Sequence, residues 1–246
     1  MKLYGLVGYP LGHSFSKKYF TDKFKNAAFE NVAYENFETT NLAELKATLS
    51  KDKRLKGLNV TIPYKSQIIG YLDDCDPVVK KLDACNCIRI SKGHWTGYNT
   101  DVIGFEKSFR KKLLSHHTHA LVLGTGGSSK AVRFVLEKLG IAYLLVSREK
   151  TGSNIISYDQ VDKALLEKYT VVINTTPAGM YPNVDEYPKL EYEALTSRHY
   201  LFDLIYNPSK TIFLQRGEEQ GAVTENGYEM LVEQAEESWR IWNATG

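Results

Sequence analysis

Short apolar runs alternate with amphipathic segments along most of the chain. Helical spacing of apolar residues predicts helices within residues 19–28, 41–49, 77–82, 102–114, 130–139, 212–220 and 228–242. Runs of strand length lie between them, at residues 2–8, 33–37, 56–60, 85–91, 94–98, 121–123, 141–146, 170–174 and 200–204. Strands that alternate with helices usually form parallel sheets, so the pattern predicts an α/β protein with mostly parallel sheet.

The stretch LVLGTGGSSKAV, residues 121–132, joins an apolar strand to a helix through a glycine turn. Gly124, Gly126 and Gly127 would let a pyrophosphate approach the amide groups at the helix N-terminus. Another strand follows at residues 141–146 and completes the start of a β-α-β unit. Methyltransferases and ordinary tight turns can show a similar glycine pattern, but the flanking elements favour dinucleotide binding.

The residues at the end of the strand at 141–146 help to distinguish NAD from NADP. An acidic residue there would hydrogen-bond the ribose hydroxyls of NAD, whereas this chain has Ser147 and Arg148 followed by Glu149. A hydroxyl beside a guanidinium suits a 2′-phosphate, so the pattern favours NADP. Two alternatives stay open: Arg148 is an ordinary surface charge, or Glu149 accepts hydrogen bonds from the ribose.

Composition narrows the class of protein. The chain has 246 residues, of which 43% are hydrophobic and 24% charged, and its formal net charge is +2. These values are typical of a soluble globular protein and give no reason to expect binding to nucleic acid or membranes. The odd number of cysteines, three, excludes a disulfide framework. No apolar run could span a bilayer and the N-terminus does not resemble a signal peptide, so we expect a cytoplasmic protein.

Two serines precede the first amphipathic segment. Ser14 and Ser16 follow the first strand and could simply cap the helix. The same position, where a parallel strand ends and a helix begins, also suits an anionic ligand such as a carboxylate. The residues of this segment do not decide between the two roles.

Polar residues also follow the strand at residues 56–60, within the stretch GLNVTIPYK. Asn59 and Thr61 lie at its carboxyl end, and Pro63 ends the strand. Lys65 comes directly afterwards, where its long side chain would either reach the same cleft or lie in solvent.

Other polar residues lie at the ends of predicted elements. Asn86 begins a strand and is either a turn residue or a donor to a ligand. Asp101 begins a helix, where an aspartate is normally a cap. The loop TTPAGM, which begins at Thr175, follows a strand of the second half and would lie beside a bound dinucleotide. Gln234 lies within the apolar face of the last helix, although a solvated glutamine is also consistent with the pattern.

Two clusters of metal-ligating residue types need a structural explanation. Cys85 and Cys87 have no second pair at zinc-like spacing, which favours small core residues over a metal site. His116, His117 and His119 lie in a polar linker, where we expect side chains that point into solvent. No metal is predicted.

Taken together, these motifs resemble the shikimate dehydrogenase family. The matching segments are GYPLGHSFS, GLNVTIPYK, ACN, GYNTDVIGF, VLGTGGSSKAV, VSR, INTTPAGM, FDLIYNPSKT and NGYEMLVEQA. They follow the family's order over nearly the whole chain, and GLNVTIPYK together with GYNTD is highly specific.

The resemblance implies a two-domain α/β enzyme. Residues 1–101, completed by a helix within 227–246, would bind 3-dehydroshikimate or shikimate, and a Rossmann-type domain at 102–226 would bind NADP. The implied reaction is the reversible reduction of 3-dehydroshikimate to shikimate, in the biosynthesis of chorismate and aromatic amino acids. The enzyme would act on this small molecule as a monomer or homodimer.

The resemblance also implies a role for each site residue. Lys65 and Asp101 would be the catalytic pair, in which the ammonium stabilises the alkoxide formed by hydride transfer. Ser14 and Ser16 would hold the substrate carboxylate. The ring hydroxyls would be bound by Asn59, Thr61, Asn86 and Asp101, and the pocket would be completed by Tyr206 and Gln234. The cofactor would contact Gly124, Thr125, Gly126, Gly127, Ser128, Ser147, Arg148, Thr175, Thr176 and Gly227.

The chain departs from the family pattern at a few positions. Lys17 replaces the usual proline after the second serine, and Cys87 replaces the common threonine after Asn86. Ser147-Arg148-Glu149 replaces Asn-Arg-Thr, which exchanges one expected hydroxyl for an acid. The alternatives are a dehydrogenase that also uses quinate, with NAD, and a catalytically silent dinucleotide-binding regulator. The presence of both catalytic side chains argues against the second alternative.

Overall fold

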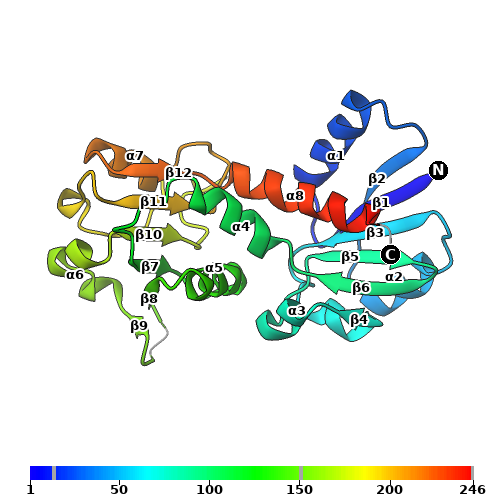
Figure 1. The fold of residues 1–246 in the computed structure, drawn as a ribbon, viewed down its shortest axis with the longest axis horizontal. Coiled ribbons are helices and arrows are strands. Elements are labelled where there is room, and N and C mark those ends of the chain that lie inside the picture. Colours follow the sequence, from blue (N-terminus) through cyan, green and yellow to red (C-terminus); the bar gives the residue numbers. More distant parts are fainter. Residues whose placement is uncertain (13–14, 150–151, 245–246) are drawn as a thin grey trace. The chain divides into compact units, whose positions relative to one another are not determined.

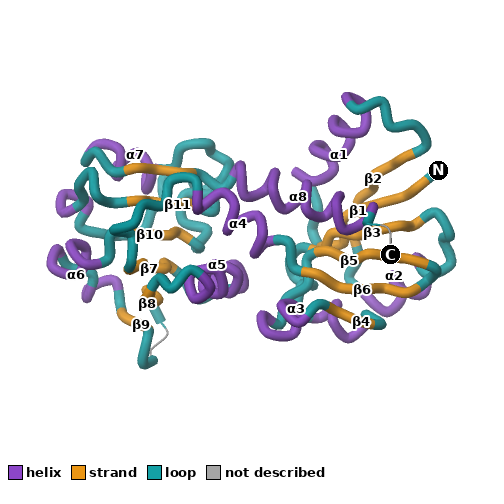
Figure 2. Tube along the Cα trace, viewed as in Figure 1, coloured by secondary structure: helices purple, strands orange, loops and turns teal. Residues whose placement is uncertain are grey.

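The computed structural model describes residues 1–12, 15–149 and 152–244 (Figure 1). The chain divides into two compact units, which we call unit 1 (residues 1–100 and 235–246) and unit 2 (residues 101–234). Each unit is built on one sheet with helices, as Figure 2 shows. The predicted α/β fold is therefore confirmed.

Unit 1 has a six-stranded sheet in the order β2-β1-β3-β5-β6-β4. Strands β1, β2 and β3 are parallel to one another, whereas β5 is antiparallel to both β3 and β6. The strands are β1 (Lys2–Gly8), β2 (Val32–Glu38), β3 (Leu55–Val60), β4 (Asp74–Cys75), β5 (Cys87–Ser91) and β6 (His94–Tyr98). The helices are α1 (Phe15–Asn26), α2 (Leu42–Leu49), the 3-10 helix η1 (Gln67–Tyr71), α3 (Pro77–Leu82) and the second half of α8 (Tyr228–Asn243).

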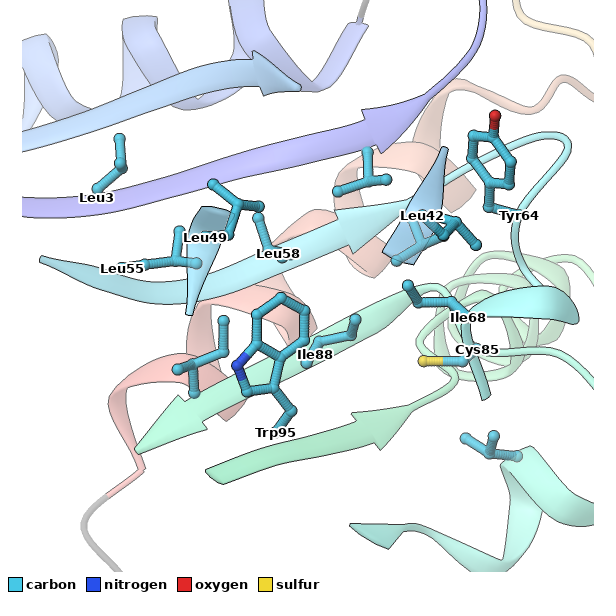
Figure 3. Packing of buried hydrophobic residues seen from close by; sticks show 14 residues of the cluster. Leu3, Leu42, Leu49, Leu55, Leu58, Tyr64, Ile68, Cys85, Ile88 and Trp95 are labelled. Atoms are coloured by element: carbon cyan, nitrogen blue, oxygen red, sulfur yellow. The ribbon is translucent and has the colours of Figure 1, made fainter. Parts of the chain in front are cut away.

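The central strands β1 and β3 are buried on both faces of the sheet, which explains their mostly apolar sequences. Leu3 and Val7 of β1 lie in the core cluster that contains the α2 leucines and Trp95 (Figure 3). Tyr4, on the opposite face of β1, stacks on Trp242 of α8 with ring centroids 4.9 Å apart. Gly57 leaves the space that the Trp242 ring fills, and Trp242 Nε1 donates to a strand carbonyl at 3.0 Å. Helix α8 is thus part of the core of unit 1.

Unit 2 has six parallel strands in the order β12-β11-β10-β7-β8-β9. They are β7 (His119–Leu123), β8 (Ala142–Val146), β9 (Ile155–Ile156), β10 (Val171–Asn174), β11 (Tyr200–Asp203) and β12 (Val223–Glu225). The helices are α4 (Asp101–Arg110), α5 (Gly127–Lys138), α6 (Lys163–Lys168), α7 (Ile212–Glu219), the first half of α8, and the 3-10 helices η2 (Tyr158–Gln160) and η3 (Tyr192–Ala194). Counted from β7, this is the strand order 3-2-1-4-5-6 of dinucleotide-binding sheets, and the order reverses between β7 and β10.

Two local expectations were wrong. The helix predicted over residues 102–114 ends at Arg110, and the Leu114 amide donates instead to His117 Nδ1 at 3.0 Å. His117 is buried, not solvated, because its Nε2 also bonds the Arg198 carbonyl oxygen at 3.1 Å. The polar linker is therefore folded against unit 2.

Within the described residues, no group of three or more histidine, cysteine or acidic side chains is placed to hold a metal ion. Cys85 and Cys87 are both buried, and burial raises the pKa of the Cys85 thiol to about 12. None of the described helices is both long and apolar enough to cross a membrane.

Candidate active site

The glycine turn between β7 and α5 lies where the strand order of unit 2 reverses. Gly124 has a φ of 99°, which glycine adopts without strain. A Cβ atom there would lie 3.0 Å from Thr175 Oγ1 and 2.9 Å from Thr176 Cγ2. At Gly126 and Gly127 a Cβ atom would meet nothing within 4 Å, and Gly126 caps α5 without a side-chain hydrogen bond. The start of α5 therefore has the space and the amide groups that a pyrophosphate needs.

The other small residues of this turn have different environments. Thr125 is half-buried and Ser128 is exposed in the first turn of α5. Ser129 is buried, and its hydroxyl donates to the Gly126 carbonyl oxygen at 2.7 Å. Ser128 is thus the accessible serine of the pair, as its predicted role requires.

The loop after β10 borders the same turn. Thr175 Oγ1 donates to the Leu123 carbonyl oxygen at 2.6 Å, which ties this loop to the end of β7. Thr176 donates from both its hydroxyl and its amide to Asn174 Oδ1, at 2.7 and 3.0 Å. The two threonines, predicted to contact the cofactor, are therefore held at the carboxyl ends of β7 and β10.

The side chain of Asp203, which sequence analysis did not single out, holds these loops through hydrogen bonds. Its buried carboxylate accepts from Asn174 Nδ2 at 3.1 Å, from the Ile205 amide at 3.0 Å and from Thr211 Oγ1 at 2.6 Å. Burial raises the pKa of Asp203 to about 7, against the effect of these donors. In the sequence, only its position at the end of a predicted strand could have indicated this role.

Arg148 lies at the wall of a cavity of about 500 Å³ in unit 2, whereas Glu149 does not line it. Burial raises the pKa of Tyr158, and the charge of Arg148 opposes that shift, which places the two side chains near each other. Ser147 is buried and its Oγ accepts from the Glu149 amide at 3.3 Å. The cavity is lined by Arg148, Tyr158, Asp159, Thr176, Pro177, Ala178, Asp185, Glu186, Tyr187, Pro188 and Lys189.

In unit 1, the candidate residues around β3 lie at its carboxyl end. The Thr61 amide donates to the Val7 carbonyl oxygen at 2.9 Å, which aligns the ends of β3 and β1. The Lys65 carbonyl oxygen accepts from the Cys85 amide at 2.7 Å, which holds Lys65 beside the segment that carries Asn86. The structure thus gathers residues from two distant segments of unit 1.

Asn59 and Asn86 are both buried and are linked to residues that sequence analysis missed. Tyr34 donates to Asn59, Thr100 bonds Asn86, and Ser238 of α8 lies between them. Ser238 follows Gln234 by one helical turn, and this spacing was the only feature of the sequence that placed it near the candidate site. Nothing in the sequence indicated a role at the site for Tyr34 or Thr100, apart from the predicted strand that holds Tyr34 and the segment GYNTD that holds Thr100.

The candidate residues Asp101, Tyr206, Gly227 and Gln234 belong to unit 2. Asp101 is the first residue of α4, and Gly104 lets α8 pack closely, since a Cβ atom at Gly104 would lie 3.0 Å from the Gln234 Cβ. The Gly227 amide donates to the Ile205 carbonyl oxygen at 2.9 Å, so the start of α8 is fixed beside the loop that carries the exposed Tyr206.

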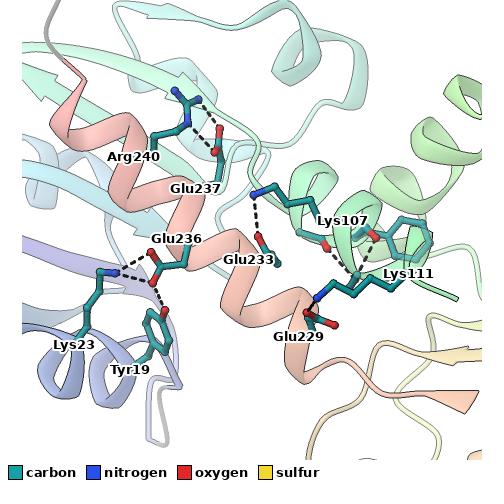
Figure 4. A network of polar contacts seen from close by, with 12 residues as sticks. Tyr19, Lys23, Lys107, Lys111, Glu229, Glu233, Glu236, Glu237 and Arg240 are labelled. Carbon is teal, nitrogen blue, oxygen red and sulfur yellow. Dashed lines mark hydrogen bonds and ion pairs between the residues drawn. The ribbon is translucent and has the colours of Figure 1, made fainter. Parts of the chain in front are cut away.

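Ion pairs hold α8 within each unit (Figure 4). In unit 2, Lys107 of α4 pairs with Glu233 at 2.8 Å. In unit 1, Lys23 of α1 pairs with Glu236 at 2.7 Å, and the Tyr19 hydroxyl donates to the same carboxylate. Ser16 is the second residue of α1, whereas Ser14 lies outside the described residues. Helix α1, whose first turn carries Ser16, is therefore attached to α8 through Tyr19 and Lys23.

The parallel sheet of unit 2, with a glycine turn at its reversal point, defines a dinucleotide-binding α/β protein. The profile described as "Shikimate dehydrogenase substrate binding domain" matches residues 6–88. The chain is 38% identical over 250 residues to the shikimate dehydrogenase (NADP+) of Clostridium beijerinckii, covering 98% of this chain and 92% of that protein. The protein belongs to the shikimate dehydrogenase family, whose members are oxidoreductases.

Solved structures agree with this assignment. A chorismate mutase/shikimate 5-dehydrogenase fusion protein from Clostridium acetobutylicum has a TM-score of 0.87 and 36% identity, covering 99% of this chain and 91% of that one. A shikimate dehydrogenase in complex with NADP+ has a TM-score of 0.85 and 30% identity, covering 100% of this chain and 91% of that one.

Proposed function

We propose that this protein is an NADP-dependent shikimate dehydrogenase that reversibly reduces 3-dehydroshikimate to shikimate. The observation that carries the proposal is the gathering of Thr61, Lys65 and Asn86 at the carboxyl end of β3, in a chain whose other unit has the dinucleotide turn. It acts in the cytoplasm, in aromatic amino-acid biosynthesis, as a monomer or homodimer. Residues 1–101 with 227–246 bind the substrate, and residues 102–226 bind NADP.

Polar side chains of the substrate site match the functional groups of shikimate. Ser14 and Ser16 hold the carboxylate, and Thr61, Asn86 and Asp101 contact the ring hydroxyls. Hydroxyl and amide groups serve this purpose because each can donate and accept hydrogen bonds. The pocket is completed by Asn59, Tyr206 and Gln234.

Lys65 and Asp101 carry the proton chemistry. NADPH, when bound, supplies the hydride for the ketone. The alkoxide that develops is stabilised by the Lys65 ammonium, which also donates the proton that completes the hydroxyl. Asp101 orients that ammonium and accepts a hydrogen bond from a substrate hydroxyl. Because the two groups are coupled, the pH–rate profile reports the pair.

The residues of unit 2 fit an NADP molecule. The open glycine turn at Gly124, Gly126 and Gly127 suits the pyrophosphate. Arg148, at the wall of the neighbouring cavity, supplies a fixed bidentate cation for the 2′-phosphate. The remaining contacts come from Thr125, Ser128, Ser147, Thr175, Thr176 and Gly227.

The proposal is tested by measuring the reduction of NADP+ and of NAD+ with shikimate and with quinate. We expect turnover with shikimate and a preference for NADP+. Efficient reduction of NAD+ with quinate would instead support a quinate dehydrogenase. Dinucleotide binding without turnover on either substrate would support a silent regulator.

A further inference from the structure

A buried chain of hydrogen bonds in unit 1 joins two of the candidate substrate residues. It runs from Tyr34 to Asn59, and from there through Ser238 and Thr100 to Asn86. Asn59, Asn86, Thr100, Ser238 and Tyr34 are all buried, with 0 to 3% of each residue exposed. Polar groups buried this deeply keep their place only if their hydrogen bonds are satisfied.

The Asn59 side chain is the centre of this chain. Its Oδ1 accepts from the Tyr34 hydroxyl at 2.9 Å. Its Nδ2 donates to Ser238 Oγ at 2.9 Å and to the Asn86 carbonyl oxygen at 3.3 Å. An asparagine amide has two hydrogens to donate, and both are used inside the protein. Asn59 therefore has no amide hydrogen left for a substrate hydroxyl in this arrangement.

The second half of the chain fixes Asn86. The Thr100 amide donates to Asn86 Oδ1 at 2.6 Å, and Asn86 Nδ2 donates to Thr100 Oγ1 at 3.0 Å. Thr100 Oγ1 also lies 3.3 Å from Ser238 Oγ. Asn59 Nδ2 donates to Ser238 Oγ, and either hydroxyl can be the donor between Ser238 and Thr100. The Thr100 backbone amide can only donate, so its contact with Asn86 identifies the amide atom that faces it as the oxygen.

We propose that Tyr34 and Ser238 are positioning residues of the substrate site, which act by fixing the amides of Asn59 and Asn86. The proposal rests on the function proposed above. Tyr34 bonds the Asn59 oxygen, and Ser238 links the Asn59 nitrogen to Thr100, which bonds Asn86. Side chains that are fixed before binding lose less freedom when the substrate binds, so the chain favours affinity.

The chain also gives the C-terminal helix a role in substrate binding that is separate from its packing. Ser238 brings a hydroxyl from α8 that accepts from Asn59 Nδ2 at 2.9 Å and lies 3.3 Å from Thr100 Oγ1. Loss of that hydroxyl leaves a buried amide hydrogen of Asn59 without this partner and removes a contact of the Thr100 hydroxyl, which bonds Asn86.

The test compares Ser238→Ala and Tyr34→Phe with two matched controls. Ser108→Ala removes a buried helical hydroxyl that donates only to carbonyl oxygens of its own helix, at 2.8 and 3.1 Å. Tyr192→Phe removes a buried tyrosine hydroxyl that donates to the Pro188 carbonyl oxygen at 2.7 Å. The measurements are kcat and KM for shikimate and for NADP+, together with a thermal melt of each variant.

We expect each of the two test variants to raise the KM for shikimate roughly tenfold, which corresponds to the loss of about one buried hydrogen bond. The value of kcat should change less than about threefold, and KM for NADP+ should stay constant. The double variant should raise KM by less than the product of the single effects, because both hydroxyls act on one amide. The controls should leave KM for shikimate unchanged even where they lower the melting temperature.

Tyr34→Phe removes a single oxygen and tests the proposal even if Ser238→Ala fails to fold. If Tyr34→Phe lowered the melting temperature but left the KM for shikimate unchanged, the proposal would be overturned. Exchange of the Asn59 side-chain amide hydrogens, followed by NMR, tests the chain without any substrate. It should be slow in the wild type and faster in either variant. Slow exchange without any turnover of shikimate would overturn the proposed function, whereas turnover with unchanged KM in both variants would overturn only this inference.

Discussion

The choice of cofactor depends on Arg148, and Arg148→Ala removes the guanidinium group that follows β8. Arg148 lines the cavity of about 500 Å³ beside the dinucleotide turn, and Glu149 does not. A charge-assisted hydrogen bond contributes about 1.5–3 kcal/mol. Since about 1.4 kcal/mol is tenfold in affinity, the variant should bind NADP+ roughly ten- to a hundredfold more weakly. NAD+ has no 2′-phosphate to lose, so its affinity should barely change.

The assay is the dissociation constant of each cofactor, measured by calorimetry on the wild type, Arg148→Ala and Glu149→Gln. Glu149→Gln is the matched control, because it removes the neighbouring charge and keeps the side-chain length. We expect it to leave NADP+ binding unchanged or slightly stronger. If the wild type preferred NAD+ and Glu149→Gln weakened NAD+ binding, then Glu149 would hold the ribose and the NADP assignment would be refuted.

Three further predictions concern catalysis, substrate binding and stability. Lys65→Ala should lower kcat by about a hundredfold or more, as loss of general acid–base catalysis does, and near-normal turnover in steady-state assays would exclude Lys65 as the acid. Replacing Ser14 and Ser16 together by alanine should raise KM for shikimate and leave NADP+ binding unchanged; a melt that shows lost stability with unchanged KM would indicate helix capping instead. Burial lowers the pKa of His117 and His199 below 6.5, so the unfolded chain binds more protons at these two residues than the folded protein does just below that pH. The free energy of unfolding from urea titrations should therefore fall as pH falls below about 6.5, with a smaller slope in His117→Gln, and equal slopes would contradict this.

The central strands β1, β3, β7, β10 and β11 could be predicted from the sequence because nearly all of their residues are buried. Such strands are largely apolar runs, as in residues 121–123 and 171–173, and they contrast clearly with amphipathic helices. The cap of α2 was also recognisable, since Asn41 Oδ1 accepts from the Ala43 and Glu44 amides. The short elements β4, β9 and α6 were not predicted, because two to six residues carry too little periodicity.

The supporting residues of the site could not be predicted. Tyr34, Thr100 and Ser238 are polar residues whose hydrogen bonds join segments far apart in the chain. A buried polar residue has the same sequence pattern as an exposed one, and only the fold brings its partners to it. Asp203 is a similar case, because its three hydrogen-bond donors belong to Asn174 of β10, to the Ile205 amide and to Thr211, the cap of α7. The sequence therefore suggests candidate ligand-binding residues, whereas the residues that hold them in place become visible only in the fold.

The central claim is that this protein transfers a hydride between NADPH and 3-dehydroshikimate. The most direct measurement is the loss of NADPH absorbance when the purified wild-type protein is mixed with 3-dehydroshikimate, with identification of the product. We expect stoichiometric conversion to shikimate, at a rate that Lys65→Ala lowers by about a hundredfold or more. Unchanged NADPH in the presence of folded wild-type protein would contradict the account.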